Sequence, residues 1–372
     1  MRQNAMRTYP ILIVTENLNV GGAEKYTVLV ANELHARGHR VVVLANQGPF
    51  RERFHPDIRF VRAFFEHGLF GVLYGAFQMV RVCLEERIVL IHAQKLESSR
   101  AAYLARFVTG VPIVKTAHGY TRKELLTLGS VINRYSDKVV TVVDWLVDEL
   151  CANGVEKGKL SLIYNGMSPA GPSLSEEERA ALRTRLGIRK GDPVLVSVSR
   201  LERGKNHAEL IEWFPQVREA VPDAKLIIVG DGPEKGRLEE QARALALDAS
   251  IAFVDATTVV DPYLQIADIF CTPSVGQGMA VLEAMAAGLP VIGTRPRGTP
   301  QVVLDGVTGF VVTKHDGPAF VSRIITLLQD AAMRQRFGRA GKELMTAQFF
   351  HGRMVDQLEE VYAECLAEHA KR

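Results

Sequence analysis

The chain has 372 residues, of which 47% are hydrophobic and 23% charged, and its net charge is +3. This composition is typical of a folded globular protein and excludes long disorder, and the length calls for two domains rather than one core. No apolar run reaches the roughly 18 to 20 residues that span a bilayer, and the short run 11–14 is followed too soon by Glu16 to be a secretory signal, so we expect a cytoplasmic protein.

Short β-branched runs alternate with helix-length segments from one end of the chain to the other, which predicts an α/β fold with parallel sheets. The runs are continuously apolar, as in strands that are covered on both faces. Six strands are expected in each half, so the sequence predicts two doubly wound, Rossmann-like domains. The expected strands are residues 11–15, 41–45, 89–92, 113–118, 139–143 and 160–164, then 194–199, 226–229, 251–254, 269–272, 291–293 and 310–312.

The boundary between the two domains is expected at a Ser/Pro/Gly-rich linker that follows residue 167. The first domain then covers residues 1–167 and the second residues 168–350. Just after the linker, Ser175 and Glu178 have the spacing of a capping box that opens a helix. The last segment, 351–372, is predicted to be an amphipathic helix, and its apolar stripe needs a surface to cover.

A glycine-rich turn leads into a short helix within residues 273–292 and predicts an anion site. Gly276 and Gly278 allow a ligand to approach the backbone closely, and the free N–H groups at the start of a helix favour phosphate. Glu283, about one and a half turns further on, would repel phosphate but could accept hydrogen bonds from the vicinal hydroxyls of a ribose. Alternatively, Glu283 is a solvated helix residue.

Two further groups follow expected strands of the first domain. Gly21 and Gly22 open a helix after the first strand, a position that suits a phosphate or a sugar, although the pattern is not the G-x-G-x-x-G of dinucleotide sites. His118, followed by Gly119, stands at the end of the fourth strand. Ligands bind at the carboxyl ends of strands in open α/β sheets, so His118 is a candidate site residue; the alternative is a core histidine.

A basic loop follows the first strand of the second domain. Arg200 and Lys205 bracket this loop and would offer one planar guanidinium and one mobile ammonium group to a diphosphate. Glu202 and Arg203 are interpreted as its solvated members. Alternatively, the whole segment is an ordinary surface loop.

Taken together, these motifs resemble those of the retaining GT-B glycosyltransferases of family 4 (group 1), which act in polysaccharide, lipopolysaccharide and glycolipid assembly. The likeness covers nearly the whole chain, and the order and spacing of the motifs make it specific. It rests on Gly21-Gly22-Ala23-Glu24, Ala117-His118-Gly119, Asn165-Gly166, Ser199-Arg200 with Lys205, Gly230-Asp231-Gly232-Pro233, Ala267-Asp268, Pro273-Ser274, Glu283-Ala284-Met285-Ala286-Ala287-Gly288 with Pro290-Val291, and Asp305-Gly306 with Thr308-Gly309.

The resemblance implies transfer of a sugar from a nucleoside-diphosphate sugar to a glycan or lipid-linked acceptor, with retention of the anomeric configuration. It assigns the donor diphosphate to Arg200 and Lys205, the ribose to Glu283, and the donor sugar near its reacting carbon to His118. The backbone that would contact the phosphates is that of Gly278, Met279 and Ala280.

The resemblance also implies a GT-B architecture, in which the two domains face each other across a cleft and the carboxyl-terminal helix (351–372) crosses back to the first domain. Such enzymes need no metal or other cofactor, because cationic side chains and a helix terminus stabilise the leaving diphosphate. The sequence agrees, since it has no Asp-x-Asp motif at an expected strand end and its four cysteines are scattered singly.

One position departs from the family pattern. The family has two glutamates eight residues apart; Glu283 is the second, but Val275 occupies the first position. Valine cannot accept a hydrogen bond from a sugar hydroxyl, which leaves three explanations: a donor that lacks this contact, a weakened or non-catalytic protein that binds nucleotide sugar, or an introduced substitution. A GT-B epimerase is a separate alternative to the transferase, against which Gly21 and Gly22 favour transfer.

The acceptor side is expected in the first domain, whose residues 1–166 hold 21 Lys and Arg against 15 Asp and Glu. Aromatic residues beside arginines suggest an amphipathic surface for a lipid-linked acceptor at an anionic membrane; the alternative is a core helix with a loop. Nucleic acid is not expected as a partner, because the basic residues are dispersed. The residues are Phe54, Phe60, Phe64, Phe65, Phe70, Tyr74 and Phe77, with Arg51, Arg53, Arg59 and Arg62.

Overall fold

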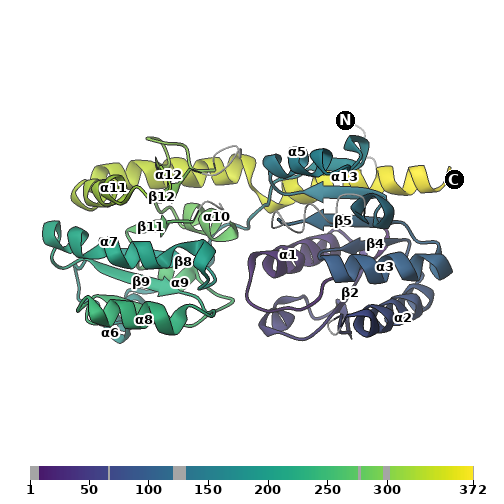
Figure 1. Ribbon diagram of the computed structural model, residues 1–372, viewed down its shortest axis with the longest axis horizontal. Coiled ribbons are helices and arrows are strands. Elements are labelled where there is room, and N and C mark those ends of the chain that lie inside the picture. Colours follow the sequence, from purple (N-terminus) through teal and green to yellow (C-terminus); the bar gives the residue numbers. More distant parts are fainter. Residues whose placement is uncertain (1–7, 66–67, 120–130, 275–277, 296–301, 372) are drawn as a thin grey trace. The chain divides into compact units, whose positions relative to one another are not determined.

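The chain forms two compact units, each built around a parallel sheet (Figure 1). The computed structural model describes residues 8–65, 68–119, 131–274, 278–295 and 302–371. Unit 1 combines Met1–Gly166 with His351–Arg372, and unit 2 is Met167–Phe350. The chain therefore leaves unit 1 at residue 166 and contributes its last helix to the same unit.

The described residues of unit 1 form seven parallel strands in the order β3-β2-β1-β4-β5-β6-β7. The predicted α/β class is confirmed, but the sequence predicts one strand fewer. It missed β3, which is a four-residue edge strand whose outer residues are exposed arginines rather than a buried apolar run. The strands are β1 (Pro10–Val14), β2 (Arg40–Ala45), β3 (Arg59–Arg62), β4 (Leu90–Ala93), β5 (Ile113–Ala117), β6 (Lys138–Thr141) and β7 (Leu160–Leu162).

Helices cover both faces of this sheet, which explains its continuously apolar strands. Alternate residues of β1 face opposite sides: Ile13 packs with α1 and α13, whereas Leu12 packs with α2 and α3. The helices are α1 (Gly22–Ala36), α2 (Leu69–Glu86), α3 (Leu96–Thr109), α5 (Asp144–Ala152) and α13 (His351–His369), with 3-10 turns η1 (Pro49–Arg53) and η2 (Lys157–Lys159).

The apolar stripe of α13 is buried in the core of unit 1. Val355 and Leu358 belong to the same cluster as the inner residues of α1. Tyr362 is fully buried, and its hydroxyl lies 2.7 Å from Nδ1 of His92 in β4. The other ring nitrogen of His92 lies 2.7 Å from Oγ1 of Thr116 in β5. A polar chain thus connects the last helix to the neighbouring strands β4 and β5.

In unit 2, the part of the chain that the structure describes forms six parallel strands in the order β10-β9-β8-β11-β12-β13. The strands are β8 (Val194–Val198), β9 (Lys225–Val229), β10 (Ile251–Val254), β11 (Ile269–Thr272), β12 (Val291–Thr294) and β13 (Gly309–Val312). The helices are α6 (Glu176–Arg185), α7 (His207–Ala220), α8 (Lys235–Ala244), α9 (Asp261–Gln265), α10 (Met279–Ala286), α11 (Gly317–Gln329) and α12 (Ala331–Gln348), with the 3-10 turn η3 (Arg203–Lys205).

Local signals set the ends of elements in unit 2. Ser175 caps α6 and forms the predicted capping box with Glu178. Gly230 lets the end of β9 touch the end of β8, because a Cβ atom there would lie 2.0 Å from the carbonyl oxygen of Ser199. Within the described part of the chain, no helix has both the length and the apolar character needed to cross a bilayer.

Candidate functional site

Each sheet has a point at which the order of its strands reverses, and such points are where open α/β sheets bind ligands. The reversal lies between β1 and β4 in unit 1 and between β8 and β11 in unit 2. Gly21 and Gly22 follow β1, whereas Arg200 and Lys205 follow β8. These four residues therefore lie at the carboxyl ends of strands that flank the reversals, whereas His118 follows β5, one strand further along.

The loop after β8 presents two cationic side chains. Arg200 is 65% exposed and pairs with Glu202 at 3.1 Å. Lys205 ends η3 and is partly buried. Burial lowers the pKa of its ammonium group; the nearby Glu202 raises this pKa and Arg200 lowers it. An anion placed between Arg200 and Lys205 would relieve their mutual repulsion.

A hydrogen bond connects this loop to the segment after β11. The Asn206 side chain donates from Nδ2 to the carbonyl oxygen of Pro273 at 3.1 Å, and the hydroxyl of Thr294 donates to the same oxygen at 3.3 Å. The loop that carries Lys205 is thereby held against the chain that leads to α10. The predicted Val275 and Gly276 lie outside the described residues.

The amino end of α10 is open in the part of the chain that the structure describes. Gly278 is its N-cap, no described side chain caps the helix, and a Cβ atom on Gly278 would have no heavy atom of the described chain within 4 Å. Met279 is buried and Ala280 half-buried, so the first turn is anchored to the core while its N–H groups remain available to an anion. Glu283 is half-buried one turn further along.

In unit 1, His118 follows β5 and is held by two neighbours. Its Nε2 atom lies 2.9 Å from Oε1 of Gln94, and its ring meets that of Tyr26 edge to face with 4.9 Å between the centroids. Burial lowers the pKa of His118 to about 3, and the nearby Lys115 contributes to the same shift. The imidazole is therefore neutral at physiological pH.

Gln94 was missed by the sequence analysis. It directly follows β4, is 2% exposed, and uses its amide oxygen to accept from His118, while its amide nitrogen has no hydrogen-bond partner in the described structure. The strand end Ile91-His92-Ala93-Gln94 carries no motif, but its position at the reversal between β1 and β4 is the signal that could have identified it.

An ion pair holds the beginning of α1. Lys95 Nζ donates to Oε1 of Glu24 at 2.6 Å and lies 3.5 Å from Oδ1 of Asn17. The Lys95 carbonyl oxygen in turn accepts from the buried Lys115 ammonium at 3.1 Å. This chain of contacts fixes the segment with Gly21 relative to β4 and β5, so the first turn of α1 is supported by side chains that themselves lie at the strand ends.

The aromatic segment of unit 1 divides between core and surface. Phe54 and Phe65 are buried, as the core alternative predicts, whereas Phe70 and Phe77 of α2 are exposed. With Leu69 and Leu73 they form an exposed row along α2, each 52 to 73% exposed. The core alternative therefore holds for the buried part of the segment, whereas a membrane-binding role of the exposed row stays a prediction.

Comparisons with known proteins identify the family. The family model "Glycosyl transferases group 1" matches residues 178–344, and the model "Glycosyltransferase Family 4" matches residues 20–170. The chain therefore belongs to the family 4 (group 1) glycosyltransferases and has the GT-B fold.

Two relatives and one solved structure illustrate the likeness. N-acetyl-alpha-D-glucosaminyl L-malate synthase of Bacillus anthracis is 26% identical over 94% of this chain and 95% of its own. Phosphatidyl-myo-inositol mannosyltransferase of Mycobacterium leprae is 28% identical, with 87% of this chain and 88% of the relative covered. The structure of Anabaena HepE in complex with UDP and glucose shares the fold with a TM-score of 0.83, at 20% identity, and covers 96% of this chain and all of that one.

Proposed function

We propose that this glycosyltransferase moves a sugar from a nucleoside-diphosphate sugar to a glycan or lipid-linked acceptor with retention of the anomeric configuration. The observation that carries the proposal is the arrangement in unit 2. Two cationic side chains follow β8, an open helix terminus follows the neighbouring β11, and the Asn206–Pro273 hydrogen bond connects the two segments. A diphosphate is the ligand whose charge and length suit this pair.

In this proposal the donor diphosphate binds to Arg200, Lys205 and the first backbone N–H groups of α10. Glu283 accepts hydrogen bonds from the ribose hydroxyls. The capture of HepE with UDP and glucose supports a nucleoside-diphosphate sugar as the donor class. Because two side-chain cations and a helix terminus together neutralise the leaving group, the transfer proceeds without a metal ion.

His118 contacts the donor sugar near the reacting carbon in this scheme. When the bond to the diphosphate breaks, the sugar develops positive charge at that carbon. A protonated imidazole there would raise the barrier, and the lowered pKa of His118 avoids this. The hydrogen bond to Gln94 fixes the direction of the ring. The acceptor hydroxyl then attacks from the face that the diphosphate leaves, and a phosphate oxygen takes its proton.

The acceptor is proposed to be lipid-linked or a glycan at a membrane surface. The name of the mycobacterial relative, a phosphatidyl-myo-inositol mannosyltransferase, supports a glycolipid acceptor. The exposed apolar row of α2 supports peripheral binding, since burying such side chains in a bilayer interface is favourable. Between Leu69 and Leu84 this helix has no acidic residue that an anionic membrane would repel, and Arg81 is exposed.

A binding panel followed by a transfer assay tests the proposal. UDP, GDP and ADP, and their common sugars, are titrated calorimetrically into the wild-type protein and into Val275→Glu. We expect saturable binding of one diphosphate, and faster turnover in Val275→Glu if the missing carboxylate impairs the native enzyme. Failure of every nucleotide to bind would refute the donor site. Nucleotide-sugar binding without turnover in either protein would favour the non-catalytic alternative instead.

A further inference from the structure

A cluster of metal-ligating side chains lies in unit 1, apart from the residues discussed so far. His35 is in the last turn of α1, and His55 and Asp57 lie in the segment between η1 and β3. One nitrogen of each histidine and one carboxylate oxygen of Asp57 lie within 4.8 Å of one another. We infer that His35, His55 and Asp57 form a binding site for a divalent transition-metal ion, with Zn²⁺ as the best match.

The chemistry of the three ligands selects this class of ion. Two imidazoles with one carboxylate suit Zn²⁺ and its neighbours in the first transition row, whereas Ca²⁺ and Mg²⁺ prefer oxygen ligands alone. Bonds of about 2.0 to 2.2 Å in a tetrahedral site put the ligand atoms roughly 3.4 Å apart. The side chains of His55 and Asp57 are 50% and 77% exposed, so small rotations can close the remaining gap.

The side chain of Asn32 already holds the two histidines together. Asn32, one turn before His35 on α1, donates from Nδ2 to the carbonyl oxygen of Arg53 at 2.9 Å and accepts from the backbone N–H of His55 at 2.8 Å. These bonds fasten the loop to the helix. As a result, the rings of His35 and His55 lie 4.6 Å apart between centroids, inclined by 34°. Little backbone ordering is therefore needed when an ion binds.

Competing interactions at the cluster are weak. The carboxylate of Asp57 lies 3.8 Å from Nδ1 of His55, and the Asp57 backbone N–H donates to that nitrogen at 3.3 Å, which is long for a hydrogen bond. The ring of His55 can therefore turn, or change its tautomer, at small cost.

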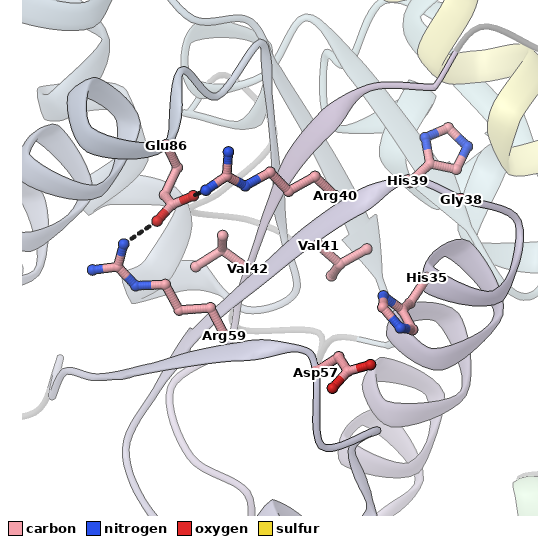
Figure 2. A pocket seen from close by; sticks show the side chains of 9 residues that line it. All are labelled: His35, Gly38, His39, Arg40, Val41, Val42, Asp57, Arg59 and Glu86. Carbon is pink, nitrogen blue, oxygen red and sulfur yellow. Dashed lines mark hydrogen bonds and ion pairs between the residues drawn. The ribbon is translucent and has the colours of Figure 1, made fainter.

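The neighbouring cations are neutralised by other groups. A cavity of about 260 Å³ is lined by His35 and Asp57 at one end, and by Glu86 between Arg40 and Arg59 at the other (Figure 2). Because both arginines pair with Glu86, they oppose a metal ion less than free guanidinium groups would. The cavity has room for a water molecule as the fourth ligand.

The inferred site lies near the amino ends of the strands, whereas His118 lies at their carboxyl ends. The helix α1 begins beside the carboxyl end of β1, so His35, in its last turn, is near the amino ends of the strands, where Arg40 and Arg59 also stand. The ion would fasten the β2–β3 connection to α1 and stabilise unit 1. It would not take part in sugar transfer, so the inference is independent of the proposed function.

Metal titration of the whole protein tests the inference. The protein is stripped with a chelator and titrated with Zn²⁺ by calorimetry and with Co²⁺ by visible absorption, together with His35→Ala, His55→Ala and Asp57→Asn. The control is His315→Ala, which removes an exposed histidine that contacts Glu209 in unit 2. Circular dichroism of the metal-free variants verifies that each is folded.

We expect one equivalent of Zn²⁺, a tetrahedral Co²⁺ spectrum and a higher melting temperature with metal. Each of the three variants should bind at least about tenfold more weakly, since even outer-shell partners of metal ligands cost about 10- to 100-fold. His315→Ala should behave like the wild type. Absence of Co²⁺ absorption in the wild type, or equal affinity in the wild type and in folded His35→Ala and His55→Ala, would overturn the inference.

Discussion

Gln94 and His118 face each other from the ends of the adjacent strands β4 and β5, and a single hydrogen bond of 2.9 Å joins the amide oxygen of Gln94 to Nε2 of His118. A neutral amide at this position holds the imidazole without supplying a charge. A carboxylate there would stabilise the imidazolium, whereas the amide leaves undisturbed the neutral state that burial favours.

This relationship predicts the effect of Gln94→Glu. The new carboxylate should raise the pKa of His118 from about 3 toward its ordinary value, and transfer should slow by at least about tenfold if a protonated ring opposes the developing charge of the sugar. NMR titration of the ring measures the pKa, and steady-state kinetics measures kcat. A higher pKa with unchanged kcat would contradict the role of His118. Gln94→Met serves as the uncharged control.

Arg200→Ala should weaken binding of the donor nucleotide by about 10- to 100-fold, because charge-assisted hydrogen bonds contribute roughly 1.5 to 3 kcal/mol. The exposed Arg200 pairs only with Glu202 at 3.1 Å in the described contacts, so the fold should tolerate its loss. Arg203→Ala is the matched control, since that arginine belongs to the same loop and pairs with Glu234. Calorimetric titration of the nucleotide compares the two variants. An equal loss of nucleotide affinity in both would indicate a general charge effect instead of a phosphate site.

Acid should destabilise the protein partly through His207. This histidine is buried at the start of α7, and burial, with a contribution from Lys205, lowers its pKa from 6.5 to about 4. The unfolded chain therefore binds a proton between those pH values that the folded chain does not. The free energy of unfolding should fall as the pH decreases through this range, by up to about 1.4 kcal/mol per pH unit, with no contribution above 6.5.

Urea unfolding at several pH values measures this slope. His207→Gln keeps a hydrogen-bonding group near Ser199 but does not titrate, so its slope should be smaller than that of the wild type. An unchanged slope would show that other groups account for the acid sensitivity.

The exposed row of α2 should decide whether the protein binds vesicles. Phe70→Ser with Phe77→Ser removes two large apolar side chains that are not part of the core, so binding to vesicles with anionic lipid should fall several-fold without loss of the fold. Phe107→Ser is the control, because Phe107 is similarly exposed but belongs to the last turn of α3 and not to the row on α2. Flotation assays compare the variants, and equal loss in the control would argue against a specific role of α2.

Local sequence signals predicted most of the fold. Apolar runs marked the central strands because both faces of each sheet are covered, and Ser175 with Glu178 marked the start of α6 through local hydrogen bonds. The edge strand β3 escaped prediction because its outer positions are exposed and need no apolar side chain, so arginines occupy them and the strand has no apolar run. The stripe of α13 indicated burial without naming a partner, and the family resemblance pointed to the first domain, where the stripe is buried.

The candidate site could be predicted only where motifs exist. Arg200, Lys205 and Glu283 were found through glycine-rich or basic loops at strand ends. Gln94 belongs to no motif, and its contact with His118 arises from the pairing of β4 with β5. The exposure of Phe77 could not be read from α2, since residues on its inner face, such as Met79, are equally apolar.

The most direct test of the account is the anomeric configuration of the product formed in the presence of a chelator. The enzyme is incubated with EDTA, the nucleoside-diphosphate sugar identified by the binding panel and a lipid-linked acceptor, and the new linkage is determined by NMR. We expect a product with the same configuration as the donor sugar, formed at a rate that EDTA does not change. An inverted product, or transfer that requires an added metal ion, would contradict it.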